Sequence, residues 1–260
     1  MDRRQLLRRT GVVAVAAGVG AAGAVGIEEF GIRAGDPGWA VGSQRPAQLW
    51  GTLTVWRART ELPIAALTFD DGPDPRYTPR ILKTLERADA PSTFFMVGKN
   101  VAEHPELARR VAGAHEIGNH SYSHPDMSRA SAPTAREQLG RTHEVIERIT
   151  KHPPIAFRPP YGRFSAATQM IAAGMNYDMI LWSDRLDSRA TPSSNVDRLG
   201  AGVKAGSIVL AHDGGTLPNQ TVCTALGPLL ERLKERGIRL VGLTELLTTV
   251  GAEAAAISQK

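Results

Sequence analysis

The sequence predicts an α/β protein built on a parallel sheet, either open or closed into a barrel. From Pro63 onward, short apolar runs alternate with longer amphipathic segments, which is the pattern of repeated βα units. Polar residues gather directly after several of the apolar runs, where the carboxyl ends of parallel strands would meet. The 260 residues, 42% of them hydrophobic, suffice for one barrel-sized domain with one substantial core.

The apolar runs are predicted as strands because each is short, rich in β-branched or aromatic residues, and bounded by turn-forming or charged residues. They are Ile64–Phe69, Ser92–Val97, His115–Asn119, Ile155–Arg158, Tyr177–Trp182, Ser207–Ala211 and Ile238–Val241. A further segment, Thr52–Trp56, alternates polar and apolar residues like a single strand ahead of the repeat.

An amphipathic segment with helical spacing of its apolar residues follows each of the seven strands. The predicted helices are Thr78–Ala88, Pro105–Ala112, Pro133–Thr150, Ala166–Ala173, Ser194–Lys204, Gln220–Glu235 and Leu243–Val250. Strict alternation of strand and helix requires crossover connections, so the sheet is expected to be parallel.

Composition divides the chain into four segments. We expect an export signal or anchor at 1–27, a spacer or N-terminal extension at 28–62, the βα domain at 63–250 and a tail at 251–260. Most of the formal net charge of +5 lies in the first ten residues, which hold four arginines and one aspartate. A nucleic-acid partner is therefore not expected, because most of the excess positive charge lies in this N-terminal segment.

The N-terminal segment has the features of an export signal. Arg3–Leu7 is a twin-arginine pattern, and an uncharged, glycine-rich apolar stretch follows over 11–27. That stretch is shorter than the ~20 residues that a membrane span requires, so we expect twin-arginine export to the cell envelope or beyond. A membrane anchor is the alternative, and without cleavage near Ala22–Ala24 the protein would stay tethered. Cys223 is the lone cysteine, so no internal disulfide forms.

Two adjacent carboxylates end the first strand, in the sequence Asp70-Asp71-Gly72-Pro73. Successive strand residues point to opposite sides, and the turn that follows can re-aim the second aspartate. One carboxylate can then bind a metal while its neighbour remains free as a base. An aspartate-rich turn that caps the next helix is the simpler alternative.

Two histidines spaced four residues apart follow the third strand. The spacing of His120 and His124 closes on one ion if the segment turns, and Asn119 and Pro125 favour a turn. With Asp71 the set becomes two histidines and one carboxylate, which leaves coordination positions open for water and substrate, as in catalytic zinc sites. Non-haem iron accepts the same ligands, and solvated loop histidines are the alternative without a metal.

Two further polar residues stand at the ends of later strands. Arg158 can pair with a carboxylate and keep it ionised, although a purely structural ion pair is the alternative. His212 ends an otherwise apolar strand, where a buried structural histidine is usual; convergence with the metal ligands instead favours an acid–base role. A free aspartate and a distant histidine fit hydrolysis better than oxygen chemistry, because hydrolysis needs an acid–base pair.

Together these motifs resemble the NodB-homology polysaccharide deacetylases, carbohydrate esterase family 4. The resemblance spans roughly residues 63–250 and is specific because four motifs occur in the right order. They are Thr68–Pro73, His120–His124, Arg158–Tyr161 and Leu210–His212. The resemblance implies a deformed (β/α)7-type barrel and a hydrolase that removes acetyl groups from an N-acetylated polysaccharide.

The resemblance also implies a role for each residue of the motifs. Asp71, His120 and His124 would hold a divalent metal, expected to be Zn²⁺, with Co²⁺ or Ni²⁺ as alternatives. The implied catalytic residues are Asp70 as general base, Arg158 beside it, His212 as general acid, and the Tyr161 N–H as an oxyanion donor. Leu210 and Pro160 would line the pocket for the acetyl methyl group.

One motif departs from the family pattern. The family has Asp-x-x-Asp-Trp after the fifth strand, whereas this chain has Asp184-Arg185-Leu186-Asp187-Ser188. The second aspartate orients the acid histidine in the family, so Asp187 is expected to do so here rather than Asp184. Ser188 replaces a tryptophan that walls the acetyl pocket, and Trp182 is a candidate to fill that space.

Three kinds of function remain open at this point. The expected substrate is an N-acetylated glycan such as peptidoglycan, chitin oligomers or xylan, with O-deacetylation included, acted on by a monomer. The first alternative is a catalytically weak carbohydrate-binding protein on the same fold, which Ser188 favours and the intact pair Asp70 and His212 disfavours. The second is a metal-dependent amidohydrolase for a small molecule, which would need a closed pocket rather than an open groove.

Overall fold

The structure, a computed structural model, describes residues 52–249 and shows the predicted α/β fold with a parallel sheet. The strands are β1 (Thr54–Val55), β2 (Ile64–Asp70), β3 (Thr93–Met96), β4 (Glu116–Asn119), β5 (Met179–Ile180), β6 (Asp184–Arg185), β7 (Ile208–His212) and β8 (Arg239–Val241). The predicted signal at 1–27, the tail at 251–260 and most of the spacer lie outside the described residues.

Helices follow the strands in the predicted alternation. They are α2 (Thr78–Arg87), α3 (Gly98–Glu103), α4 (Pro105–Ala112), α5 (Ala132–Thr150), α6 (Ala166–Gly174), α7 (Pro192–Gly202) and α8 (Gln220–Glu235), with a 3₁₀ turn η2 (Pro160–Gly162) and a last helix over 243–249. In the part of the chain that the structure describes, no helix is both long enough and apolar enough to span a membrane.

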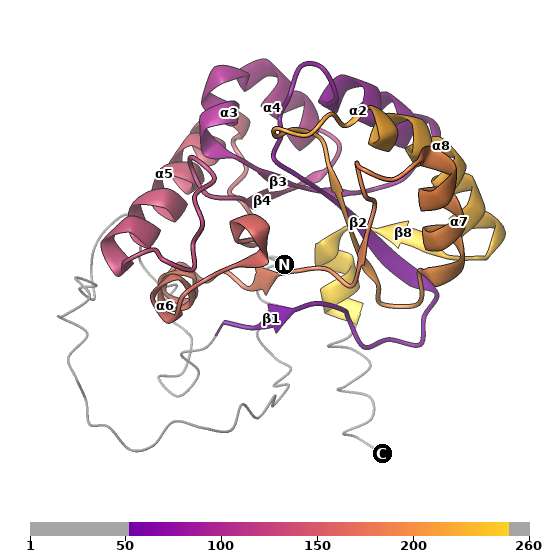
Figure 1. Ribbon diagram of the computed structural model, residues 1–260. Helices are drawn as coiled ribbons and strands as arrows, with labels where there is room; N and C mark the ends of the chain where they lie inside the picture. Colours follow the sequence, from indigo (N-terminus) through magenta and orange to yellow (C-terminus); the bar gives the residue numbers. More distant parts are fainter. Residues whose placement is uncertain (1–51, 250–260) are drawn as a thin grey trace, which may run out of the picture.

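The strands are joined into a closed, deformed barrel. β4, β3, β2, β7 and β6 lie side by side in that order, and β8 pairs with the beginning of β2. Residues 179–185 close the ring, because Ile180 donates to the Phe157 carbonyl at 2.9 Å while Ser183 donates to the Ile208 carbonyl at 3.0 Å. Helices α2–α5, α7 and α8 lie outside the strands (Figure 1).

Two local predictions differ from the structure. Ile155–Arg158 is not a strand: within it only Phe157 forms β-bridges, to Asn119 and Met179. Prolines precede and follow this segment, and they lack the N–H groups that a regular ladder needs. Helix α3 was not predicted, because its six residues are too few to show a helical period.

The central strand β2 explains how polar side chains come to lie inside the barrel. All seven of its residues are buried. Leu67 and Phe69 belong to the apolar cluster under the helices, whereas Ala66 belongs to a second cluster with Phe95 and Ile208 on the other face. Side chains alternate along a strand, so Thr68 and Asp70 face the same way as Ala66.

Candidate metal centre and active site

The two aspartates after β2 separate as the alternation predicts. Asp70 remains on the inner face of the strand, and only 3% of it is exposed. Asp71 adopts a left-handed backbone conformation with φ of 74°, which few residues other than glycine accept. The Asn100 side chain holds this turn by donating to the Asp71 carbonyl at 2.7 Å. The turn thus re-aims the second carboxylate toward the histidines.

The two histidines lie on a tight turn after β4. Ser121 and His124 both have positive φ, of 64° and 59°. Two hydrogen bonds hold the turn: Ser121 N–H donates to the Asn119 side chain at 2.9 Å, and His124 N–H donates to the Ser121 hydroxyl at 3.2 Å. The turn therefore brings both imidazole rings to the same side, 5.1 Å apart between centroids.

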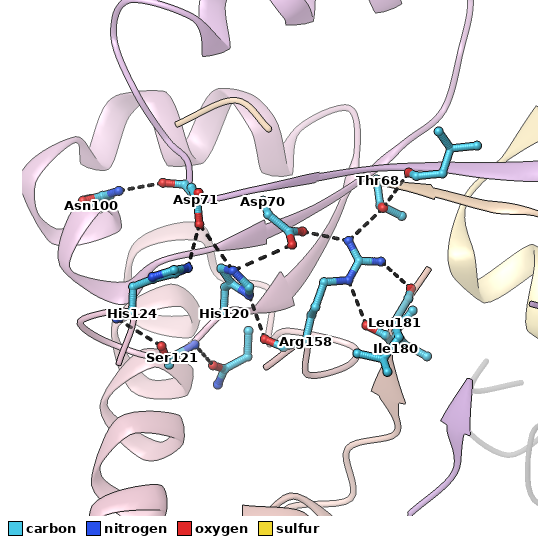
Figure 2. Close-up of polar contacts among 12 residues, drawn as sticks. Thr68, Asp70, Asp71, Asn100, His120, Ser121, His124, Arg158, Ile180 and Leu181 are labelled. Carbon is cyan, nitrogen blue, oxygen red and sulfur yellow. Dashed lines mark hydrogen bonds and ion pairs between the residues drawn. The ribbon is translucent and has the colours of Figure 1, made fainter. Parts of the chain in front are cut away.

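Three side chains converge in a geometry that suits a metal ion. One ligand atom each from Asp71, His120 and His124 lies within 4.8 Å of the other two. Asp71 Oδ1 is 3.4 Å from His120 Nε2 and 3.0 Å from His124 Nε2 (Figure 2). His120 Nδ1 lies 2.7 Å from the Arg158 carbonyl, which can only accept, so Nδ1 carries the proton and Nε2 is free as a ligand. The donor set therefore fits a divalent cation.

The charges at this centre shift the pKa values of its members. Burial raises the pKa of Asp71, but hydrogen bonds from His120 and His124 outweigh burial and hold it well below its ordinary range. Burial lowers the pKa of His120, but the Asp70 and Asp71 carboxylates and the Arg158 carbonyl outweigh burial and raise it above its ordinary value. The two carboxylates therefore make His120 harder to deprotonate than an ordinary histidine.

This arrangement predicts how metal affinity depends on pH. Metal binding needs neutral His120, and its raised pKa means that a proton competes with the metal at a higher pH than for an ordinary histidine. Affinity for Zn²⁺ should fall by about tenfold per pH unit once the pH drops below that pKa. Competition with a chromophoric chelator between about pH 8 and about pH 5.5 measures it, spanning the ordinary histidine pKa. Constant affinity across this range would contradict the assignment.

Asp70 is held by a fully buried arginine. Arg158 donates to Asp70 Oδ1 at 2.7 Å and to the Thr68 hydroxyl at 2.8 Å. It also donates to the carbonyls of Ile180 at 2.8 Å and Leu181 at 3.0 Å, which fixes the guanidinium (Figure 2). Burial lowers the pKa of Arg158, while the Asp70 charge opposes this change. This buried ion pair fixes the Asp70 carboxylate in place beside the metal ligands.

His212 lies beside Asp70 on the neighbouring strand. The parallel register pairs Thr68 with Leu210 and Asp70 with His212, so all four side chains point to the same face. Leu210 is buried, with 3% exposed, whereas His212 is partly exposed at the end of β7. The imidazole can therefore reach a molecule bound at the mouth of the barrel, the end at which the carboxyl ends of the strands lie.

Tyr161 and Pro160 belong to the turn that contacts His124. Pro160 is buried, whereas 61% of Tyr161 is exposed. The Tyr161 ring packs edge-on against His124, with centroids 4.7 Å apart. Tyr161 has a positive φ of 58°, a conformation held inside the rigid turn η2. The residues expected as a pocket wall and an oxyanion donor therefore adjoin the histidine pair.

In the segment that departs from the family pattern, residues 184–188, Asp187 and Ser188 contact residues other than His212. Asp187 Oδ1 accepts from the Arg189 N–H at 2.9 Å, and Oδ2 pairs with Arg185 at 3.4 Å. Among the described residues, no hydrogen bond joins Asp187 to His212, so its orienting role stays a prediction. The Ser188 hydroxyl donates to the Asn219 side chain at 2.7 Å.

Trp182 packs beside the site. A Cβ on Gly162 would come 2.9 Å from the Trp182 ring, and the ring lies 5.8 Å from the Arg158 guanidinium. Trp182→Ala should therefore lower kcat/KM for the hydrolysis expected from the sequence motifs by about tenfold. The reason is that the Tyr161–Gly162 turn and the Arg158 guanidinium would lose a packing partner. Steady-state kinetics measures the loss. Trp56→Ala, at a tryptophan with 53% exposed, should change nothing, and equal losses would contradict the assignment.

Two supporting residues were not predicted from the sequence. Asn100 holds the turn of Asp71, and the Thr68 hydroxyl accepts from Arg158, which also donates to Asp70. Asn119, which was expected to favour a turn before the histidines, accepts the Ser121 N–H that holds it. Asn100 is far from both motifs and gave no signal.

The fold and site define a class of protein: a parallel α/β barrel with a candidate His₂Asp metal centre and an adjacent carboxylate, arranged for hydrolysis. The family model described as polysaccharide deacetylase matches residues 57–180. A peptidoglycan-N-acetylglucosamine deacetylase of Bacillus cereus is 40% identical over 198 residues, which cover 74% of this chain and 92% of that protein. The chain therefore belongs to the polysaccharide deacetylase family, a family of metal-dependent hydrolases.

Two other relatives extend this comparison. A chitooligosaccharide deacetylase of Sinorhizobium fredii is 34% identical, with 74% of this chain and 95% of that protein covered. The crystal structure of the Bc1960 peptidoglycan N-acetylglucosamine deacetylase superposes with a TM-score of 0.72 at 31% identity, covering 75% of this chain and 92% of that one. The family expected from the sequence motifs is thereby confirmed.

Proposed function

We propose that this protein is an exported, zinc-dependent enzyme that removes N-acetyl groups from peptidoglycan or a related N-acetylated glycan. The observation that carries the proposal is the set of Asp71, His120 and His124 within 4.8 Å, beside a second carboxylate ion-paired to a buried arginine. The set Nε2, Nε2 and carboxylate oxygen matches a catalytic zinc site with open positions. Co²⁺ and Ni²⁺ suit the same ligands.

The chain's own residues supply the proton transfers. A divalent cation bound by Asp71, His120 and His124 would polarise the acetyl carbonyl and lower the pKa of a water molecule. Asp70, held in place by its ion pair with Arg158, takes a proton from the attacking water. His212 protonates the leaving amine nitrogen, because an amine anion is a very poor leaving group.

The remaining residues would hold the acetyl group. The Tyr161 N–H donates to the developing oxyanion, a contribution of about 3–4 kcal/mol per donor in comparable sites. Leu210 and Pro160, both buried, line the space for the methyl group. Asp187 remains the proposed partner of His212, which requires its carboxylate to leave Arg185 when substrate is bound.

The choice of substrate rests on location and on the relatives. A twin-arginine signal at 1–27 would bring the folded enzyme to the cell envelope, where peptidoglycan is the nearest N-acetylated polymer. Two of the relatives named above act, by their names, on peptidoglycan N-acetylglucosamine, and a third acts on chitooligosaccharide. We propose a monomer whose only link to the membrane would be an uncleaved N-terminal segment.

Acetate release tests this proposal directly. The purified protein, stripped with chelator and then supplied with Zn²⁺, Co²⁺ or Ni²⁺, is incubated with peptidoglycan and with N-acetylglucosamine oligomers. Metal-dependent release of acetate is expected from at least one of them. Acetylated xylan tests whether the same site cleaves esters.

The same experiment separates the alternatives. Binding of glycans without acetate release, with metal bound, would favour a carbohydrate-binding protein. Release from small N-acetyl compounds but from no oligomer would favour a small-molecule amidohydrolase. The pair of Asp70 with Arg158 favours the enzyme, because a protein that only binds glycans needs no ionised base beside its metal.

A further inference from the structure

A buried acid that the proposed mechanism does not use lies directly behind the metal-ligand turn. Asp213 follows His212, and only 1% of it is exposed. Its Oδ2 accepts from the Thr78 hydroxyl at 2.6 Å, and the carboxyl packs directly against the backbone of Gly72. Gly72 must be glycine for this approach, because a Cβ there would come 2.1 Å from Asp213 Oδ2.

The segment that begins with Asp213 packs closely around Asp71. The Asp213 N–H donates to the Asp70 carbonyl at 3.1 Å. A Cβ on Gly214 would come 2.4 Å from the Asp71 carbonyl oxygen, and one on Gly215 would come 2.4 Å from Asp71 Oδ2. Backbone without side chains therefore meets the metal ligand on this side, which leaves Asp71 no room to turn away from the histidines.

The peptide group between Asp71 and Gly72 is confined from two sides. Its carbonyl accepts from the Asn100 side chain at 2.7 Å, and the Asp213 carboxyl packs against Gly72 so closely that a Cβ there would collide with it. This peptide plane sets the ψ torsion of Asp71 and so helps to hold a residue whose φ of 74° is unfavourable for an aspartate. The direction of the Asp71 carboxylate thus depends on both contacts.

We propose that Asp213 is a positioning residue for metal binding: by fixing the Asp71–Gly72 peptide, its carboxyl aims Asp71 at the cation shared with His120 and His124. This inference rests on the metal site of the proposed function. Hydrogen bonds beyond the direct ligands commonly set metal affinity in this way. Asp213 contacts no reacting atom.

The requirement is for a side chain of this shape in a fixed place rather than for a charge. Burial raises the pKa of Asp213 to about 7, against the opposing hydrogen bond from Thr78, and the nearby Asp71 and Asp70 carboxylates raise it further. An uncharged amide of the same shape is therefore a conservative replacement. In Asp213→Asn the amide oxygen can accept from the Thr78 hydroxyl, and the side chain keeps its packing against Gly72.

Zinc affinity of the metal-stripped full chain is the test, measured by competition with a chromophoric chelator. Asp213→Ala should weaken binding by about 10–100-fold, the usual effect of losing a partner that orients a ligand. Asp213→Asn should stay within about threefold of the wild type, because it can keep both the Thr78 hydrogen bond and the packing against Gly72. Gly72→Ala is a second variant in case Asp213→Ala does not fold, and it should weaken binding by about tenfold or more through the collision with Asp213.

A matched control separates positioning from general stability. Thr150→Val removes a buried hydroxyl that donates to two carbonyls at the end of α5, and Thr150 makes no contact with the metal ligands. It should lower the unfolding midpoint and leave zinc affinity unchanged. If Asp213→Ala is less stable but binds zinc like the wild type, the positioning role of Asp213 is overturned and the proposed function is not. A wild type that binds no zinc would overturn the proposed function, and this inference with it.

Discussion

Asp70→Asn is expected to reduce acetate release to near the detection limit while bound zinc remains stoichiometric. Asp70 Oδ1 is engaged by Arg158 at 2.7 Å, and Oδ2 lies 3.7 Å from His120 Nε2, so Asp70 borders the metal ligands without belonging to them. An amide can still accept from Arg158 but cannot take a proton from water. The loss of general-base catalysis corresponds to roughly 10²–10⁴-fold in kcat.

Kinetics and elemental analysis on the same preparation check this prediction. Asp74→Asn is the matched control: it changes an aspartate in the same loop whose carboxylate pairs with Arg76 and contacts no metal ligand. It should leave both kcat and zinc content unchanged. Loss of zinc from Asp70→Asn would mean that the roles of Asp70 and Asp71 have been assigned the wrong way round.

The fold was predictable where a segment's own pattern determines its structure. Pro105–Ala112 has a proline at its start and clear helical spacing, and α4 has the predicted bounds. Ile155–Arg158 reads as a strand on its own, but the flanking prolines limit its ladder to Phe157. Whether an apolar run joins a sheet depends on partners far away in the sequence, and its composition does not encode them.

The placement of the main site residues was also predictable from sequence patterns. Period-two alternation separates Asp70 from Asp71, and parallel topology brings His212 beside Asp70. The contacts of Asn100 and Asp213 with the Asp71–Gly72 peptide were beyond sequence reasoning, because each joins a side chain to a distant part of the backbone. Such contacts follow from exact backbone placement, which a pattern of residue types does not specify.

His212→Ala is expected to lower deacetylation of amide substrates by roughly 10²–10⁴-fold, the usual value of a general acid. The physical reason is the leaving group. Breaking the C–N bond without a proton would release an amine anion. His212, partly exposed beside Asp70, is positioned to donate that proton. His152→Ala, at an exposed histidine that belongs to none of the motifs, should leave the rate unchanged.

The choice of substrate makes this prediction specific to the acid role. With an activated aryl acetate the phenolate leaves without protonation, so His212→Ala should lose less than about tenfold on the ester while losing far more on the amide. Asp70→Asn should lose activity on both substrates, because each reaction needs an activated water. Equal losses of His212→Ala on ester and amide would instead place His212 in binding or in support of Asp70, and would leave the proton donor to be found elsewhere at the mouth of the barrel.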